Sequence, residues 1–143
     1  MISLEQAIYA RLTGHAGTAA LVGARVYPGT TPQNPTFPFI VFEQTTDDAP
    51  WRHLGGRTAL RRATMQIDIY SLSRSATAAI ARQVRFALDE APGTITVGAG
   101  SLVIVTARLV TETDTTETDL PASAVPMFRT SAEYSFVHQI PLS

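Results

Sequence analysis

Apolar and polar residues alternate over residues 63–70. The alternation sorts this stretch into two sets, Ala63, Met65, Ile67 and Ile69 against Thr64, Gln66, Asp68 and Tyr70. A period of two is typical of a β-strand with one buried face. Weaker versions of the pattern predict strands over residues 25–27, 37–44, 102–112 and 127–139. The apolar faces predicted for the last two strands are Val103, Val105, Ala107 and Leu109, and Phe128, Ala132, Tyr134 and Phe136.

Two longer stretches show helical spacing instead. Ser3 and Gln6 form the signature of a capping box before a helix whose apolar residues are Leu4, Ala7, Ile8 and Leu12. Ser73 or Ser75 can cap a second helix with the apolar stripe Ala76, Ile80, Val84, Ala87, Leu88 and Ala91. A short helical turn is expected over residues 18–22. The order of elements predicts an α+β fold, a mostly antiparallel four- to five-stranded sheet with two helices packed on one face.

The strand at residues 37–44 is apolar on both faces. One face holds Phe37, Phe39 and Val41, and the other holds Ile40 and Phe42. Helices can cover only one of these faces, and monomers seldom expose large apolar patches. The second face is therefore expected to be covered either by another copy of the chain or by the chain's own N-terminal segment.

Composition narrows the class of protein. The chain has 143 residues, which indicates one domain over residues 1–143. The net charge is −1, so no overall positive field favours nucleic acid. There is no cysteine for a disulfide or a thiolate metal site. No apolar run approaches the roughly 20 residues that span a bilayer, and the N-terminus has no signal-peptide pattern, so no membrane partner is expected.

The sequence offers no convergent chemical site. Three histidines, His15, His53 and His138, are far apart, and a zinc site would require distant segments to meet. Asp68 lacks an evident partner for acid–base chemistry, and no GxSxG motif occurs. The GAG at residues 98–100 precedes a strand, which favours a hairpin turn over a phosphate cradle. We therefore predict no catalytic residue, no metal ligand, no cofactor and no enzymatic activity.

Two segments carry opposite charge. The basic segment contains Trp51, Arg52, His53, Arg57, Arg61 and Arg62, and the acidic segment contains Glu112, Asp114, Glu117 and Asp119. Residues 111–123 are expected to form an exposed hairpin tip. Unlike surfaces of this kind suit head-to-tail contact between identical copies, which closes into a ring when the rotation permits. Two alternatives for the basic segment are contact with nucleic acid through an aromatic residue among arginines, and a solvated loop.

The stretches RVYPGTTPQNPTFPFIVFEQ and TMQIDIYSLSRSATAAIARQVRFAL resemble the tail-completion, or tail terminator, proteins of long-tailed bacteriophages and gene-transfer particles. The shared pattern is an R-V-Y-P turn, a P-F-I-V-F strand and a Q-I-D-I-Y strand leading into a helix rich in alanine and arginine. The resemblance covers about residues 1–88, and the C-terminal hairpin only by layout. The long acidic segment before the last strand departs from it.

The resemblance implies a virion structural protein made in the bacterial cytoplasm. Such proteins form a ring, commonly of six copies, at the head-proximal end of the tail tube, where they stop tube polymerisation and meet a neck or connector protein. The expected partners are thus other copies of the chain, the tube protein and the connector, with no specific nucleic acid. Interface residues are expected among Tyr27, Pro28, Phe39, Phe42, Trp51, Arg57, Arg61, Arg62, Glu112, Asp114, Glu117 and Asp119. The alternatives are a head-closure or neck protein, a small enzyme, and a nucleic-acid-binding domain.

Overall fold

The computed structural model of the chain describes residues 3–33, 35–47, 51–52, 58–89, 93–97, 100–117 and 127–141. These residues form three helices, α1 (Leu4–Gly14), α2 (Ala16–Val22) and α3 (Arg74–Leu88). They also form seven strands: β1 (Val26–Pro28), β2 (Phe39–Asp47), β3 (Trp51–Arg52), β4 (Thr58–Ser71), β5 (Gly93–Val97), β6 (Gly100–Glu117) and β7 (Met127–Pro141).

Serine side chains fix where α1 and α3 begin. Ser3 Oγ accepts a hydrogen bond from the Gln6 backbone N–H at 3.1 Å, and Gln6 Oε1 accepts one from the Ser3 N–H at 2.9 Å. Ser73 Oγ accepts from the Ala76 N–H at 3.1 Å. These bonds satisfy N–H groups that have no partner within the first helical turn. The predicted capping box and the predicted serine cap at Ser73 are confirmed.

The strands form one sheet in the order β1-β2-β4-β7-β6-β5, with β3 also paired to β4. Only β1 and β2 run parallel; the other pairs are antiparallel. The α+β class and the mostly antiparallel sheet are confirmed, but the predicted number of strands was too low. It omitted β3, which is too short to show alternation, and β5, in which only Ile95 is buried.

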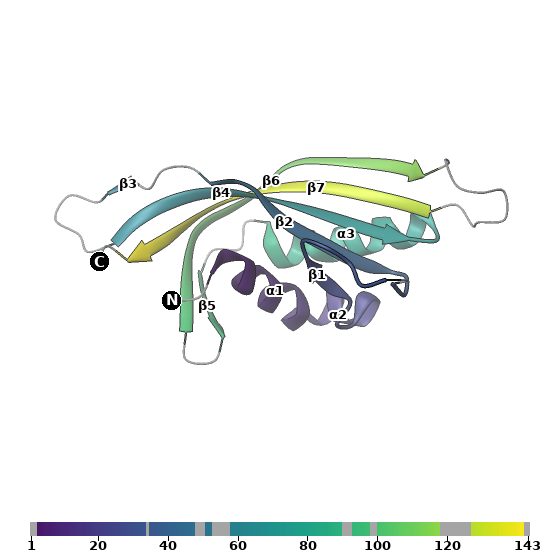
Figure 1. The fold of residues 1–143 in the computed structure, drawn as a ribbon, viewed down its shortest axis with the longest axis horizontal. Helices are drawn as coiled ribbons and strands as arrows, with labels where there is room; N and C mark the ends of the chain where they lie inside the picture. The colour runs from purple at the N-terminus through teal and green to yellow at the C-terminus, as the bar shows by residue number, and fades with distance from the viewer. Residues whose placement is uncertain are drawn as a thin grey trace.

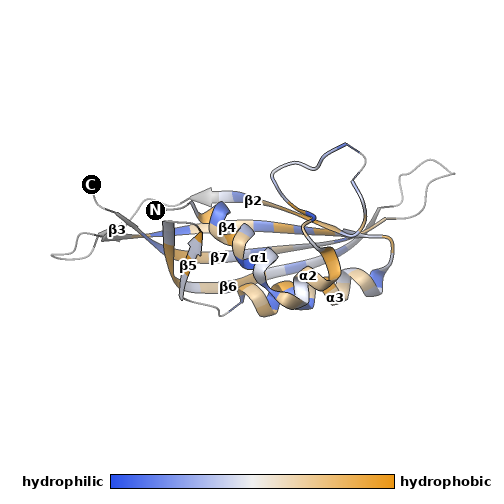
Figure 2. Ribbon diagram, turned by 90° about the horizontal axis from the view of Figure 1, so that it is seen from below, coloured by the Kyte–Doolittle hydropathy of each residue, from blue (hydrophilic) through white to orange (hydrophobic). Residues whose placement is uncertain are grey.

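All three helices lie on the same side of the sheet, which arches over them (Figure 1). The view from below shows α1, α2 and α3 lying across that face (Figure 2). The predicted placement of two helices on one face is thus confirmed for α1 and α3, and α2 is a short third helix on the same side. Between the two layers lies a core whose fully buried side chains include Ile8, Leu12, Ile40, Phe42, Met65, Ile67, Ile80, Leu88, Leu102 and Phe136.

Strand β6 carries an irregularity that the sequence pattern concealed. Its register with β7 shifts at two points, Ile104/Thr106 and Leu109/Thr111. Ile104 and Ala107 are both buried, whereas Val105 between them is 39% exposed. The predicted apolar face is therefore wrong at Val103 and Val105. A β-bulge inserts one extra residue, which moves the following side chains to the opposite face of the strand.

Candidate assembly surfaces

Four aromatic side chains, Tyr27, Phe37, Phe39 and Tyr70, form an aromatic cluster on the helix-free face of the sheet. The Phe39 ring centroid lies 6.2 Å from that of Tyr27, 5.1 Å from that of Phe37 and 5.0 Å from that of Tyr70, on which it stacks. The register explains this gathering, because β4 places Tyr70 directly opposite Phe39. Phe39 is left only 4% exposed.

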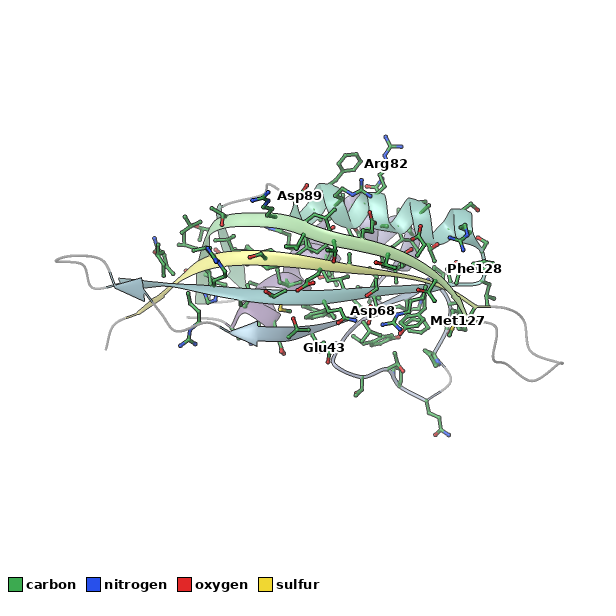
Figure 3. All side chains as sticks on the ribbon, turned by 90° about the horizontal axis from the view of Figure 1, so that it is seen from above. Glu43, Asp68, Arg82, Asp89, Met127 and Phe128 are labelled. Carbon is green, nitrogen blue, oxygen red and sulfur yellow. The ribbon has the colours of Figure 1, made fainter. Side chains whose placement is uncertain are left out.

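An ion pair borders the aromatic cluster. Arg129 Nη2 lies 3.1 Å from Asp68 Oδ2, and the Asp68 side chain is 12% exposed. Gln66 Nε2 lies within hydrogen-bonding distance of both Asp68 carboxylate oxygens, at 3.2 Å. The Arg129 guanidinium carbon lies 5.7 Å from the centroid of the Tyr70 ring. Asp68, visible on this face in Figure 3, is thus engaged by two neighbouring side chains rather than presented to a substrate.

The chain itself therefore buries Phe39, Ile40 and Phe42 of the apolar strand, whereas Phe37 and Val41 on the helix-free face are half-buried. Ile40 and Phe42 are fully buried toward the helices, and Phe39 is buried by the aromatic cluster. The expectation that a second copy covers the helix-free side is wrong at Phe39, and Phe42 retains no exposed surface for another subunit. The N-terminal segment is not the cover either, because α1 packs on the opposite side of the sheet (Figure 1). The rings of β1 and β4 supply it instead.

Two of the predicted acidic contacts are engaged within the chain. Arg85 Nη2 donates to Glu112 Oε2 at 2.8 Å. Asp114 Oδ1 accepts from Thr130 Oγ1 at 2.8 Å, and Asp114 Oδ2 lies 3.8 Å from Arg74 Nη1. Both acids thus meet arginines of α3 within the chain, and their contact with the basic segment of another copy stays a prediction. Residues 111–117 complete β6 and are not a hairpin tip, because their pairing with β7 continues to Glu117. Asp119 lies outside the described residues.

The basic segment is divided between the two faces of the sheet. Arg61 pairs with the buried His138 on the helix side, whereas its neighbour Arg62 is exposed on the helix-free side. Arg62 borders a shallow depression of about 400 Å³ together with Arg108 and Ser135. The backbone of Trp51 lies in β3, and Arg57 lies outside the described residues. The two adjacent arginines therefore point to opposite faces of the sheet.

Two grooves flank α1 on the helix side of the molecule. The larger, about 670 Å³, runs between α1, β5 and the end of β1, and its lining includes Tyr9, Pro28 and Val97. The smaller, about 480 Å³, lies toward α3 and includes Phe86. Tyr9, Val97 and Phe86 are 40%, 37% and 59% exposed. Of the predicted contacts, Pro28 thus borders an apolar groove, whereas Tyr27 is half-buried in the aromatic cluster.

The two described histidines, His15 and His138, lie at a helix cap and inside the sheet. His15 Nδ1 accepts from the Thr18 N–H at 3.3 Å and so caps α2, and His138 is buried in the sheet opposite Ile104. His53 lies outside the described residues. Within the part of the chain that the structure describes, no group of three or more His, Asp or Glu residues could hold a metal ion.

One titratable group in the core is strongly perturbed. Burial raises the pKa of the Tyr134 phenol, and the nearby Glu112 carboxylate acts in the same direction. Tyr134 is 1% exposed, so its hydroxyl faces protein rather than an open site. None of the described helices is long and apolar enough to cross a membrane.

Comparison with known proteins identifies relatives of this chain. The family model described as tail completion protein gp17 matches residues 6–132. Among solved structures, a chain from the virion of a native gene transfer agent particle superposes with a TM-score of 0.67. The two chains share 20% sequence identity, and the match covers 96% of each, so the similarity is one of fold. No curated protein matches the sequence.

Fold and family together define a structural protein of a phage-type tail. The chain belongs to the tail completion protein gp17 family. The resemblance noted in the sequence is thus confirmed, and it reaches further than residue 88, because the family match continues through β6 into β7. The polar pairing of Asp68 with Arg129 was missed, because a single sequence does not show that residues 61 positions apart are cross-strand neighbours.

Proposed function

We propose that the protein forms a ring of identical copies, six by the resemblance, that caps the head-proximal end of the tail tube. The ring stops tube polymerisation and joins the tail to a connector or neck protein of the head. The observation that carries this proposal is the family match over residues 6–132, which spans most of the chain. The similarity in fold to a chain of a gene transfer agent virion supports it.

The packing of the monomer is compatible with assembly on a template. Phe39, Ile40 and Phe42 of β2 are all buried within the chain, so a single copy needs no partner to bury them. Such copies can remain separate in solution and gather on a tube end, where each meets the tube and two neighbours at once. Several modest contacts made together hold a subunit far better than one of them alone.

We retain as candidate contact residues the predicted residues other than the buried Phe39 and Phe42. They are Tyr27, Pro28, Trp51, Arg57, Arg61, Arg62, Glu112, Asp114, Glu117 and Asp119. Arg62 is the sharpest test among them because it is exposed and sits on the helix-free face.

Tube polymerisation with purified components tests the proposed function. Adding this protein to the tail tube protein of the same particle should shorten the tubes and leave a ring at one end, as seen by negative-stain electron microscopy. Portal-side connector protein added afterwards should bind capped ends only. Tubes that elongate unchanged, or binding to the connector without any effect on tubes, would contradict the proposal and favour a neck protein.

The contact residues are tested by charge reversal. Replacing both Arg61 and Arg62 with Glu is expected to weaken assembly while the monomer stays folded. The single variant Arg62→Glu isolates the helix-free face, and Arg82→Glu on α3 is its matched control at another exposed arginine. If Arg62→Glu caps tubes as well as Arg82→Glu does, Arg62 is not a contact residue.

A further inference from the structure

The outer edge of β6 has no strand beside it beyond Ile104 in the part of the chain that the structure describes. β5 pairs with Gly100 through Ile104, whereas β6 continues to Glu117, and no other described strand pairs with that edge. Backbone N–H and C=O groups on such an edge can pair with a strand of another copy and cause association. Soluble proteins therefore usually block an edge of this kind by other means.

The charges along this edge divide it into two parts. Residues 111–115, TETDT, carry two acids, which an antiparallel contact between two copies centred on Thr113 would bring opposite each other. Residues 105–110, VTARLV, carry no acid and a single arginine. Val105 and Val110 are 39% and 52% exposed, and valine favours strands. Like charge thus opposes self-pairing in the first part but not in the second.

A carboxylate at the end of α3 is bound to the edge in the part that lacks acids. The Leu109 backbone N–H donates to Asp89 Oδ1 at 2.8 Å, so this donor is already engaged and cannot bond to the backbone of a second strand. Figure 3 shows Asp89 beside this edge of β6. The register shifts at Ile104/Thr106 and Leu109/Thr111 also interrupt regular pairing here.

The helix that carries Asp89 gives no reason for an acid at this position. Asp89 is the C-terminal cap of α3, and its backbone N–H donates to the Arg85 carbonyl at 2.8 Å. The C-terminal end of a helix carries partial negative charge, which disfavours a carboxylate and favours a cation. Arg85 in the last turn is paired with Glu112 at 2.8 Å. The contact that accounts for the carboxylate is therefore its bond to Leu109.

The opposite edge of the sheet is blocked in a comparable way at β1. The Val26 N–H donates to the Ala24 carbonyl at 2.8 Å. Pro28 has no N–H, and its carbonyl accepts from the Thr30 N–H at 2.9 Å. On both sides of the sheet, groups outside the strand pairing thus engage backbone atoms of an edge strand.

We propose that Asp89 is an edge-blocking residue, whose carboxylate keeps free copies of the chain from pairing β6 with β6. Without the carboxylate, the favoured contact is antiparallel and centred on Leu109. That register places Arg108 opposite Val110, and it opposes no like charges between residues 105 and 113. The inference goes beyond the proposed function, because it concerns the isolated chain.

Sedimentation equilibrium of the isolated chain tests the role of the carboxylate. Asp89→Ala should form dimers, with a dissociation constant at least about tenfold lower than that of any dimer of the native chain. Asp89→Asn retains a side-chain oxygen that can accept from the Leu109 N–H and should behave as the native chain does. Ser73→Ala is the matched control for stability, because it removes the N-cap bond of the same helix and leaves β6 unchanged. It should stay monomeric.

A second substitution tests where the copies meet. Val110→Lys in the Asp89→Ala chain would place a lysine opposite Arg108 of the second copy, and should return the chain to monomers. Val97→Lys in the same chain is the control at a 37% exposed valine of β5, and should leave the dimers intact.

The outcomes separate an edge-blocking role from a merely structural one. An Asp89→Ala chain that stays monomeric would overturn the inference, because the carboxylate would then only satisfy the Leu109 N–H. Equal association of Asp89→Ala and Ser73→Ala would overturn it as well, by tracing association to lost stability. Dimers that survive Val110→Lys would contradict the contact at β6. No tube protein enters these experiments, so their failure would leave the capping function standing, and a failure to cap tubes would leave this inference standing.

Discussion

Strands β2 and β6 invert the expectations that their sequences raise. β2 is apolar on both faces and looked incomplete, yet Phe39 and Phe42 are both buried within the chain. β6 ends in the polar run TETDTTE, which looked like a solvated tip, yet this run pairs regularly with β7 and no other described strand pairs with its second edge. The apolar strand thus buries Phe39 and Phe42 without a partner, whereas the polar end of β6 has an edge that no other described strand pairs.

The difference teaches that hydrophobicity and backbone pairing are separate signals. An apolar side chain indicates a buried position, but the residues that bury it can come from any part of the same chain. An unpaired strand edge cannot be recognised from the side-chain pattern, because its unpaired N–H and C=O groups belong to the backbone. The following four variants test the comparison, in order of decreasing effect.

Phe42→Ala should have the largest effect on stability. Phe42 is fully buried between the sheet and the helices, and its removal leaves a cavity as well as losing apolar burial. The free energy of unfolding, measured by urea denaturation, should fall by about 4 kcal/mol. Phe86→Ala, at a side chain that is 59% exposed, is the control and should change it far less. Equal losses in the two variants would contradict the placement of the core.

Phe39→Ala addresses the helix-free side of β2 directly. Because three aromatic rings of the same chain pack on Phe39, the isolated monomer should lose about 3 kcal/mol of unfolding free energy. A side chain that is covered only by a neighbouring copy would leave the monomer unchanged and weaken only the ring. Denaturation of the monomer at low concentration, beside a capping assay, distinguishes the two cases.

Asp89→Ala should have an intermediate effect on the protected part of the β6 edge. It leaves the Leu109 N–H without its acceptor and should cost about 1–2 kcal/mol of unfolding free energy. Hydrogen exchange at the Leu109 amide should accelerate. Asp89→Asn keeps a side-chain oxygen that can accept this bond and should retain most of the protection. Slow exchange at Leu109 in the alanine variant would show that the carboxylate does not close this edge.

Thr113→Lys should have the smallest effect on the isolated chain. Thr113 is exposed on the part of β6 beyond its pairing with β5. The free energy of unfolding of the monomer, obtained from thermal denaturation, should therefore change by no more than about 0.5 kcal/mol. Any weakening of capping by this variant is then an effect on contact between subunits. A substantial loss of monomer stability would show instead that this end of β6 is packed within the chain.

The helices and strands with strong periodicity were predicted correctly, but the contacts between residues distant in the sequence were not. The alternation in residues 63–70 identified the buried face of β4, and the spacing after Ser3 and Ser73 identified α1 and α3. The prediction was wrong for Val103 and Val105, because the bulges of β6 are set by pairing with β7 rather than by local sequence. The ion pairs of Glu112 and Asp114 with α3 were not predicted, because that helix is distant from them in sequence.

The sequence by itself determined the α+β class, the family, and which side chains are buried. It could do so because local spacing and apolar character are properties of short segments. Only the tertiary structure decided which groups cover them. Phe39 is buried because β1 and β4 bring Tyr27 and Tyr70 beside it, and among the described strands only β5 pairs with the second edge of β6, ending at Ile104. Both outcomes depend on contacts between residues far apart in the chain, and these follow from how the strands are ordered in the sheet.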